Sequence, residues 1–182
     1  MIQSIKDDID EKTWRRIQQD TNLSSSLCRK LTETYIFNNI SVIGHGDPFF
    51  ANMFYDDRTK MLKFIDPKGV EKEEELWTDP YYDVAKLSHS ILGNYDFIIN
   101  ELFSIQLNAD LHLSLTVDNY MSKSYGELFL NKAEKAGFNP RIIRLFEASL
   151  FISMLPLHID NQRHVLAFIL NSIQILKEIE NA

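Results

Sequence analysis

The sequence predicts an α+β domain in which helices predominate and one small β-hairpin carries a group of polar residues. Apolar residues recur at three-to-four spacing over most of the chain after residue 82, which is typical of amphipathic helices. Between residues 41 and 65 this spacing gives way to short β-prone runs on either side of the polar turn 56–60. No internal repeat or linker divides the 182 residues, so we expect a single domain.

The individual elements follow from the same patterns. Two leading helices are expected over residues 7–20 and 24–39. A short buried strand (41–44), a hairpin (52–55 and 61–65) and an acidic surface loop (71–78) come next. Five further helices are predicted over residues 83–93, 95–106, 117–136, 140–156 and 161–180. Residues 1–40 are thus the leading helices, 41–70 the hairpin region, and 79–182 a helical subdomain.

Local signals mark one boundary between these helices. Gly137 is placed to end the helix over 117–136 as a C′ glycine. Asn139 followed by Pro140 is typical of an N-cap and a first helical position. For the last helix, Asp160 or Asn161 is the expected N-cap.

Composition limits the class of protein. Hydrophobic residues make up 45% of the chain, which has only 6 glycines and 5 prolines, so a packed globular domain is expected. The net charge of −7 argues against a broad basic surface for nucleic acid or an anionic membrane. Cys28 is the single cysteine, which excludes an intrachain disulfide and favours a reducing compartment. The apolar stretches fall short of the roughly 20 residues that span a bilayer, so we expect a cytoplasmic protein.

The most informative motif lies between residues 45 and 69. His45-Gly46-Asp47 is followed by Asn52, five residues after the aspartate, and Ile65-Asp66-Pro67-Lys68-Gly69 comes after the hairpin. Phosphoryl transfer needs one carboxylate to orient a hydroxyl and accept its proton, and further oxygen ligands to hold Mg²⁺ on nucleotide phosphates. The spacing of Asp47 and Asn52 equals that of the D-x-x-x-x-N loop of protein kinases. These residue types predict a phosphotransferase site.

Three motifs in the same order resemble the aminoglycoside and choline kinase-like phosphotransferases. That family carries H-G-D-x-x-x-x-N, then two apolar residues and Asp, then D-P-x-Y-D-hydrophobic-A in its C-terminal lobe. This chain has His45 to Asn52, Phe64-Ile65-Asp66, and Asp79-Pro80-Tyr81-Tyr82-Asp83-Val84-Ala85. The Ile-Asp-Pro-Lys-Gly run is similar to members found in bacterial capsule and surface-polysaccharide gene sets. Pro48 departs from the leucine usual in the family and removes a backbone donor.

The resemblance implies a role for each matching residue. Asp47 would be the base that faces the acceptor hydroxyl, and Asn52 and Asp66 would hold Mg²⁺. His45 would brace the loop, and Asp83 would accept backbone N–H groups of the loop or cap the next helix.

Two further residues are candidate contacts to phosphate or substrate. Lys68 follows Asp66 by two residues, and a solvated side chain is the alternative. His89 lies on the predicted helix after Asp83, and a hydrogen-bonded core or surface histidine is the simpler interpretation.

The family's N-terminal β lobe has no counterpart in the sequence pattern. Such a lobe brings a phosphate-covering Gly-rich loop and a lysine. No glycine precedes Gly44, and the forty-odd residues before it are predicted to be helical. The resemblance therefore covers a C-terminal lobe with the N-terminal β lobe absent: a fragment of a larger kinase, one subunit of a split enzyme, or a retained lobe that no longer catalyses.

Simpler interpretations stand beside each motif. Asp and Asn are common in turns, which would explain Asp47 and Asn52 one at a time. His45 and Asp47 could instead form an H-x-D metal pair with His89 or His158. The acidic run 71–75 could attract a cationic acceptor, although a solvated loop explains it as well.

Two functions of different classes follow as expectations. The first is an ATP- and Mg²⁺-dependent kinase domain that phosphorylates a hydroxyl of a sugar, polyol or related metabolite. The second is an inactive kinase-like lobe that binds another chain or itself through an apolar face left bare. Both predict a protein without nucleic-acid or membrane partners.

Overall fold

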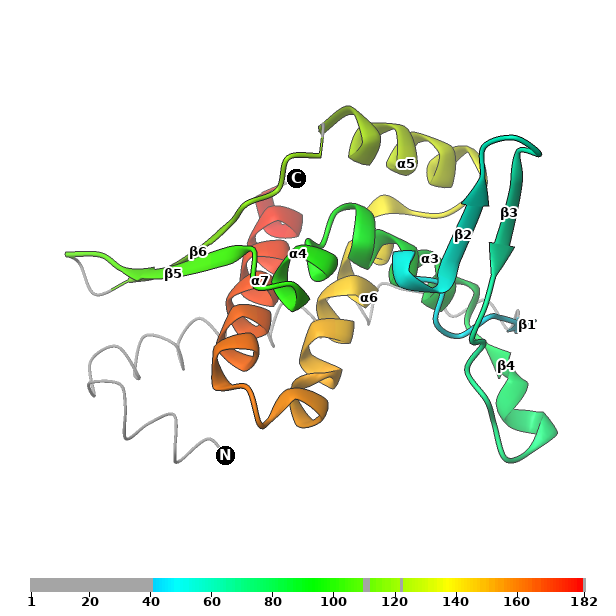
Figure 1. Cartoon of the computed structure of the whole chain (residues 1–182), viewed down its shortest axis with the longest axis horizontal. Helices are drawn as coiled ribbons and strands as arrows, with labels where there is room; N and C mark the ends of the chain where they lie inside the picture. The colour runs from blue at the N-terminus through cyan, green and yellow to red at the C-terminus, as the bar shows by residue number, and fades with distance from the viewer. Residues whose placement is uncertain (1–40, 110–111, 122, 182) are drawn as a thin grey trace.

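The computed structural model describes residues 41–109, 112–121 and 123–181; the helices predicted over 7–20 and 24–39 lie outside them. Short strands and 3₁₀ turns precede a helical body (Figure 1). The strands are β1 (Val42–Ile43), β2 (Met53–Asp56), β3 (Met61–Phe64), β4 (Trp77–Thr78), β5 (Phe103–Leu107) and β6 (Leu113–Val117). The helices are η1 (Phe50–Asn52), η2 (Glu73–Leu76), α3 (Pro80–Ile91), α4 (Tyr95–Ile99), α5 (Lys123–Lys135), α6 (Pro140–Ser153), η3 (Leu155–His158) and α7 (Gln162–Asn181).

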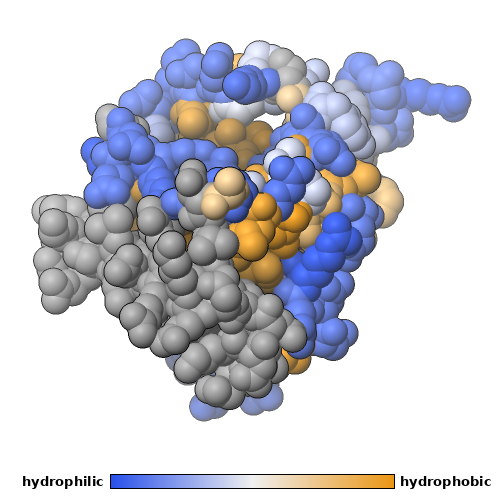
Figure 2. Space-filling model, turned by 90° about the vertical axis from the view of Figure 1, so that its left-hand side faces the viewer, coloured by the Kyte–Doolittle hydropathy of each residue, from blue (hydrophilic) through white to orange (hydrophobic). Residues whose placement is uncertain are grey.

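The core lies where α6 packs against both α7 and α3. Apolar residues recur every three or four positions along α6 and α7, so each helix turns one apolar stripe inward. Fully buried side chains from these helices and α4 include Ile98, Ile143, Phe151, Phe168 and Ile175. Figure 2 shows other hydrophobic residues at the surface of one face of the molecule, bordered by hydrophilic ones.

The ends of two helices follow the predicted capping chemistry. Asn139 caps α6 by accepting the Arg141 N–H, and Pro140 occupies the first turn. Gly137 has φ +92°, and the Phe138 N–H bonds back to the Ala133 carbonyl, as expected after the end of α5. These two helix ends confirm the sequence predictions. Both were predictable because a helix end depends on local backbone conformation.

A buried charge cluster joins α3 to α6 and α7. Glu147 is fully buried, and it accepts hydrogen bonds from the Ser88 hydroxyl and the Arg144 guanidinium. Arg144 also pairs with Glu178 at 2.8 Å. Burial raises the pKa of Glu147, and Arg144 acts in the opposite direction. The Ser88 hydroxyl is the contact from α3 to this buried carboxylate, so it favours the face of α3 that turns Ser88 toward α6.

The described residues form three separate two-stranded antiparallel sheets beside the helical body. β1 pairs with β4, β2 with β3, and β5 with β6. The β2–β3 hairpin stands at one end of the molecule, and β5–β6 extends from the other (Figure 1). The predicted hairpin over 52–65 is therefore confirmed, and its polar turn is closed by Asp56, which accepts from the Arg58 N–H.

The helix predicted over residues 95–106 is wrong in its second half. Helix α4 ends at Ile99, and Glu101 takes a left-handed φ of +61° before strand β5 begins. In β5 the apolar residues Phe103, Ile105 and Leu107 alternate with polar ones, and this alternation also satisfies part of a helical pattern. The segment 79–182 is thus not purely helical.

Two other expectations need correction. The helix predicted from residue 117 begins only at Lys123, because residues up to Val117 pair in strand β6. The strand around residue 42 exists and pairs with β4, but it is not buried, since Ile43 is 63% exposed. Within the described ranges, no helix combines the length and apolar character needed to cross a membrane.

Candidate functional site

One face of α3 holds the polar loop, which we define as residues 45–52. Asp83, Lys86 and Ser90 are spaced three and four residues apart, so they lie on one side of the helix. Each contacts a different part of the polar loop: the backbone at its start, the Asp47 side chain, and the backbone at Phe50. Contacts along about two turns of α3 therefore determine the path of the loop.

Asp83 anchors the beginning of the polar loop. Its two carboxylate oxygens accept the N–H groups of His45, at 2.6 Å, and Gly46, at 2.9 Å. Gly44 lies against the same carboxylate, because a Cβ there would stand 2.8 Å from Oδ2. These are charge-assisted hydrogen bonds, roughly twice as strong as neutral ones. They are the contacts that the resemblance implied for Asp83.

Asp47 and Asn52 lie together within the loop. The Asn52 Nδ2 donates to the Asp47 carbonyl at 2.9 Å and lies 3.4 Å from Asp47 Oδ2. Asn52 is buried, whereas the Asp47 side chain is 34% exposed. The other oxygen, Oδ1, is 2.9 Å from the Lys86 ammonium. The Asp47 carboxylate is therefore accessible to solvent, with Asn52 beside one of its oxygens and Lys86 beside the other.

The end of the hairpin brings Asp66 to the same region. The Ile65 N–H bonds to the Asn52 carbonyl at 3.0 Å, and Asp66 follows directly. Asp66 is exposed and has φ +54°, a left-handed conformation that residues other than glycine adopt rarely. Such strain is frequent at functional sites. The Lys68 N–H then bonds to the His45 carbonyl at 2.8 Å, which joins both motif segments.

Aromatic side chains support the loop from beneath. Phe49 packs edge-on against Tyr95, with ring centroids 5.6 Å apart. Tyr95 stacks on His89 at 4.4 Å, and His89 meets Phe151 of the core at 4.1 Å. Burial raises the pKa of Tyr95, and the carboxylates of Asp96 and Asp47 add to this shift.

The structure places His89 in the core rather than at a surface that substrate could reach. Its side chain is 1% exposed. Burial lowers the pKa of His89 to about 3, with a further contribution from the ammonium of Lys86. The imidazole is therefore neutral at ordinary pH and serves as a flat packing element. This agrees with the core-histidine interpretation and not with a phosphate contact.

Oxygen ligands suited to Mg²⁺ are present at the end of the hairpin. Asn52 uses its Nδ2 toward Asp47, which leaves the carboxamide oxygen available, and Asp66 supplies an exposed carboxylate. Mg²⁺ is commonly bound by one or two such side chains together with substrate phosphates and waters. The residues thus fit a magnesium ion that arrives with a nucleotide.

A metal site built from histidine is not supported. Among the residues that the structure describes, no three His, Cys, Asp or Glu side chains are grouped as metal ligands would be. His89 is enclosed by aromatic rings, and His158 lies beside His164 and Phe168 instead. The H-x-D pair that the sequence left open therefore lacks further ligands in this part of the chain.

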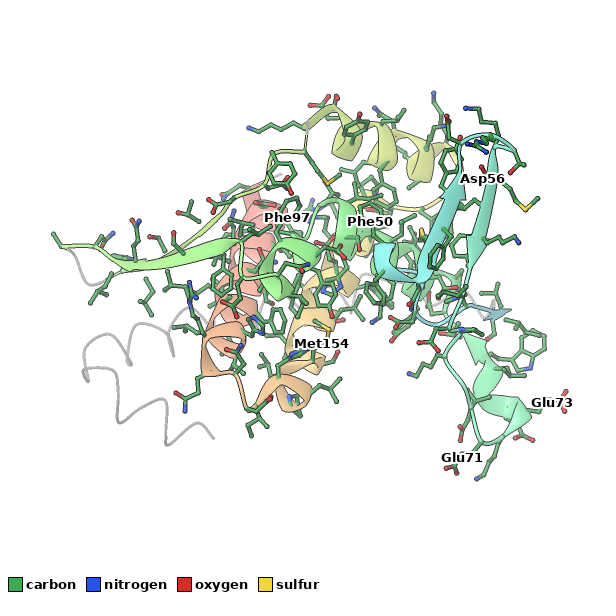
Figure 3. All side chains as sticks on the ribbon, viewed as in Figure 1. Phe50, Asp56, Glu71, Glu73, Phe97 and Met154 are labelled. Atoms are coloured by element: carbon green, nitrogen blue, oxygen red, sulfur yellow. The ribbon has the colours of Figure 1, made fainter. Side chains whose placement is uncertain are left out.

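Three further surface features are a lysine near the loop, the acidic run 71–75 and an apolar hollow. Lys68 is exposed, and its ammonium lies 5.8 Å over the Tyr82 ring. The acidic run 71–75 is exposed, and Figure 3 shows Glu71 and Glu73 pointing outward at the edge of the molecule, away from Phe50. An apolar hollow of about 300 Å³ lies beside Phe50. Its further lining residues are Ile91, Met121, Tyr125, Leu128, Phe129 and Lys132.

Sequence reasoning did not assign Lys86 and Ser90 to the site. The signal was present, because both follow Asp83 at helical spacing on the predicted helix. Once Asp83 is expected to face the loop, residues three and seven positions later share that face. Pro48, in contrast, was noted as a departure; it is buried, and the Asp47 carbonyl before it still accepts from both Phe49 and Asn52.

Comparison with family models, curated proteins and solved structures finds no match to this chain.

Substitution of Gly46 tests the geometry of the loop. Gly46 has φ +80°, and an added Cβ would lie 2.6 Å from the Lys68 Cβ. Gly46→Ala should lower the free energy of unfolding by at least about 1 kcal/mol, because a left-handed conformation is unfavourable with a Cβ. The control is Gly69→Ala, where a Cβ meets open space, and a change within about 0.5 kcal/mol is expected. Equal effects in urea denaturation would contradict the structure.

The buried His89 predicts a loss of stability in acid. A histidine in the unfolded chain titrates near 6.5, whereas His89 in the folded protein titrates at about 3. Between these values the unfolded chain binds the additional proton, so the free energy of unfolding falls as pH falls. At about 1.4 kcal/mol per pH unit, this amounts to about 2 kcal/mol between pH 6.5 and 5.

His89→Phe should remove this contribution. The measurement is urea denaturation at pH 7 and pH 5, and the stability lost between them should be about 2 kcal/mol smaller in the variant. Packing changes affect both pH values alike, so they cancel in the difference. An undiminished loss would show that His89 is not buried as a neutral imidazole.

Proposed function

We propose that this chain is a phosphotransferase domain that moves the γ-phosphoryl group of ATP to a hydroxyl of a small molecule. The observation that carries the proposal is the convergence of three motif residues. Asn52 is bonded through its side chain to Asp47 and through its backbone to Ile65, next to Asp66. A base and two oxygen ligands at adjacent positions are what phosphoryl transfer requires.

Asp47 has the position and exposure for the proton-transfer step. As the acceptor oxygen bonds to phosphorus, the bond between phosphorus and the oxygen of the leaving ADP breaks. The acceptor hydroxyl proton passes to the Asp47 carboxylate. Asn52 holds the loop carbonyl of Asp47 at 2.9 Å, so the direction of this carboxylate is fixed before substrate binds.

Asn52 and Asp66 are the residues that would hold Mg²⁺. When bound, the ion neutralises charge on the nucleotide phosphates and orients them. The carboxamide oxygen of Asn52 and the carboxylate of Asp66 supply hard oxygen ligands of the type that Mg²⁺ prefers. His45 acts as a brace, since its Nδ1 accepts the Asp47 N–H at 3.3 Å.

A neutral polyhydroxylated acceptor, such as a sugar or polyol, fits the site best. A polycationic acceptor would be favoured by carboxylates around the loop, yet the acidic run 71–75 lies exposed at the edge of the molecule (Figure 3). The similarity of Ile65 to Gly69 to members found with surface-polysaccharide genes supports the same class of acceptor. The activity would then serve the synthesis of a capsule or surface-polysaccharide precursor.

A second candidate function is an interaction module. The two sheets beside the loop expose large apolar side chains, among them the cross-strand pair Ile43 and Trp77, which are 63% and 54% exposed. Others on the hairpin are Phe54, Tyr55, Met61, Leu62 and Phe64. Exposed apolar side chains gathered in this way are typical of surfaces that bind another protein. A lobe on another chain, or a second copy, would cover them.

Thermal unfolding with millimolar ATP and Mg²⁺ tests the proposed function. Ligand at a hundred times its Kd adds about 2.7 kcal/mol, which raises the Tm by several degrees in a chain of this size. The shift should need Mg²⁺ and disappear in Asp66→Ala. Asp47→Ala should keep the shift and lose phosphoryl transfer, because Asp47 acts on the acceptor.

The matched control is Asp57→Ala. Asp57 is a carboxylate in the hairpin turn, 83% exposed and paired with Lys60, so its loss should leave the shift unchanged. A wild-type chain without any Mg²⁺-dependent shift, together with dimers in light scattering, would favour the interaction module. Equal turnover in wild type and Asp47→Ala would overturn the assignment of the base.

A further inference from the structure

Lys86 differs from the other α3 residues that contact the polar loop. Asp83 and Ser90 accept backbone N–H groups, which fix the path of the chain. Lys86 instead contacts a side chain, with its ammonium 2.9 Å from Asp47 Oδ1. The loop backbone is thus held without Lys86, whose charge is directed at the one carboxylate proposed to act on the acceptor.

The lysine ammonium has donors beyond the one used by Asp47. An ammonium carries three N–H donors and no acceptor. Over the described ranges, Asp47 is the single carboxylate within 4 Å of Lys86. The Lys86 side chain is only 14% exposed, so its charge is screened by solvent less than that of an exposed lysine. Lys86 is thus a largely buried positive charge beside a carboxylate that is accessible to solvent.

The position of this charge matters for the reaction. In an in-line transfer, the phosphoryl group moves onto the acceptor oxygen. In the proposed reaction, that oxygen is hydrogen-bonded to the Asp47 carboxylate. An ammonium on the same carboxylate therefore lies beside the oxygens of the transferring group. Positive charge at this point stabilises the transition state without rearrangement.

Resting on the proposed function, we propose that Lys86 contacts the γ-phosphoryl group of ATP while it remains bound to Asp47. Lysine is a common phosphate ligand in proteins, acting as a point charge. Lys68, the other lysine near the loop, lies over the Tyr82 ring at 5.8 Å and is exposed. Lys86 is the lysine that the structure places on the base itself.

The comparison of ATP with ADP isolates this contact, because only ATP has a γ-phosphoryl group. Titration calorimetry of the full chain with Mg²⁺·ATP and Mg²⁺·ADP gives the ratio of the two Kd values. Lys86→Met should lower the preference for ATP by about tenfold or more, which is about 1.4 kcal/mol. Lys86→Arg keeps the charge and should hold the preference within about threefold of wild type.

Two controls separate contact from simpler effects. Lys135→Met removes an exposed lysine at the end of α5 and should leave the preference unchanged. The double variant Lys86→Met/Asp47→Asn removes both members of the ion pair. If Lys86 only neutralised Asp47, this variant would recover the preference for ATP; direct contact with phosphate predicts that it stays low.

The outcomes distinguish a failure of the Lys86 contact from a failure of the proposed function. A wild-type chain that prefers ATP and loses the preference in Lys86→Met and in the double variant supports the proposal. A preference retained in Lys86→Met, or recovered in the double variant, overturns the contact but leaves nucleotide binding intact. A wild-type chain that binds neither nucleotide overturns the proposed function and the role of Lys86 with it. If Lys86→Met does not fold, Lys86→Gln serves in its place.

Discussion

The polar loop depends on one carboxylate of helix α3. Asp83 accepts two consecutive backbone N–H groups, one on each of its carboxylate oxygens, so the chain has to direct both amides to the same side. Gly46 turns the chain there with a φ of +80°. The direction of the Asp47 side chain is then set by Lys86 of the helix together with Asn52 of the loop. The position of the proposed base follows from these contacts.

Helix α3 can hold the loop because its opposite side packs against α6 and is bonded to it. Ser88 bonds to the buried Glu147, and Arg144 compensates that charge from α6. Gly93, just beyond α3, lies so close to Glu147 that an added Cβ would stand 2.5 Å from its Oε1. A cluster of buried charges is weak support for stability, but a slip of α3 would remove the Ser88 hydroxyl from the buried Glu147 carboxylate and leave Arg144 as its partner within α6. The helical body thus positions a site that lies outside it.

Sequence patterns predicted those parts of the fold that depend on local chemistry. The Asn139-Pro140 cap, Gly137 and the β2–β3 hairpin each require particular residues at adjacent positions, and the structure confirms them. The strands β5 and β6 were missed, because the short apolar alternation from Phe103 to Leu107 also satisfies helical spacing. Pairing with β6 decides between the two, and this pairing is not visible in the pattern of either segment taken alone.

The same distinction applies to the candidate site. The motif spacing predicted that Asp47, Asn52 and Asp66 belong together; hydrogen bonds join Asn52 to Asp47 and to Ile65, the residue before Asp66. The contact of Lys86 with Asp47 spans 39 residues and depends on the rotation of α3 about its axis. The burial of His89 depends on that rotation as well. Helical spacing from Asp83 indicates the face on which Lys86 lies, but its partner Asp47 belongs to another segment of the sequence.

Hydrogen exchange of the loop amides is the most direct test of the central claim that α3 holds the polar loop. The N–H groups of His45, Gly46 and Phe50 are bonded to α3 side chains and should exchange slowly, at rates that follow the opening of α3 itself. NMR of the full chain at neutral pH resolves these amides individually. Slow exchange in step with α3 is the predicted result. Rapid exchange of the three amides while α3 remains protected would contradict the account.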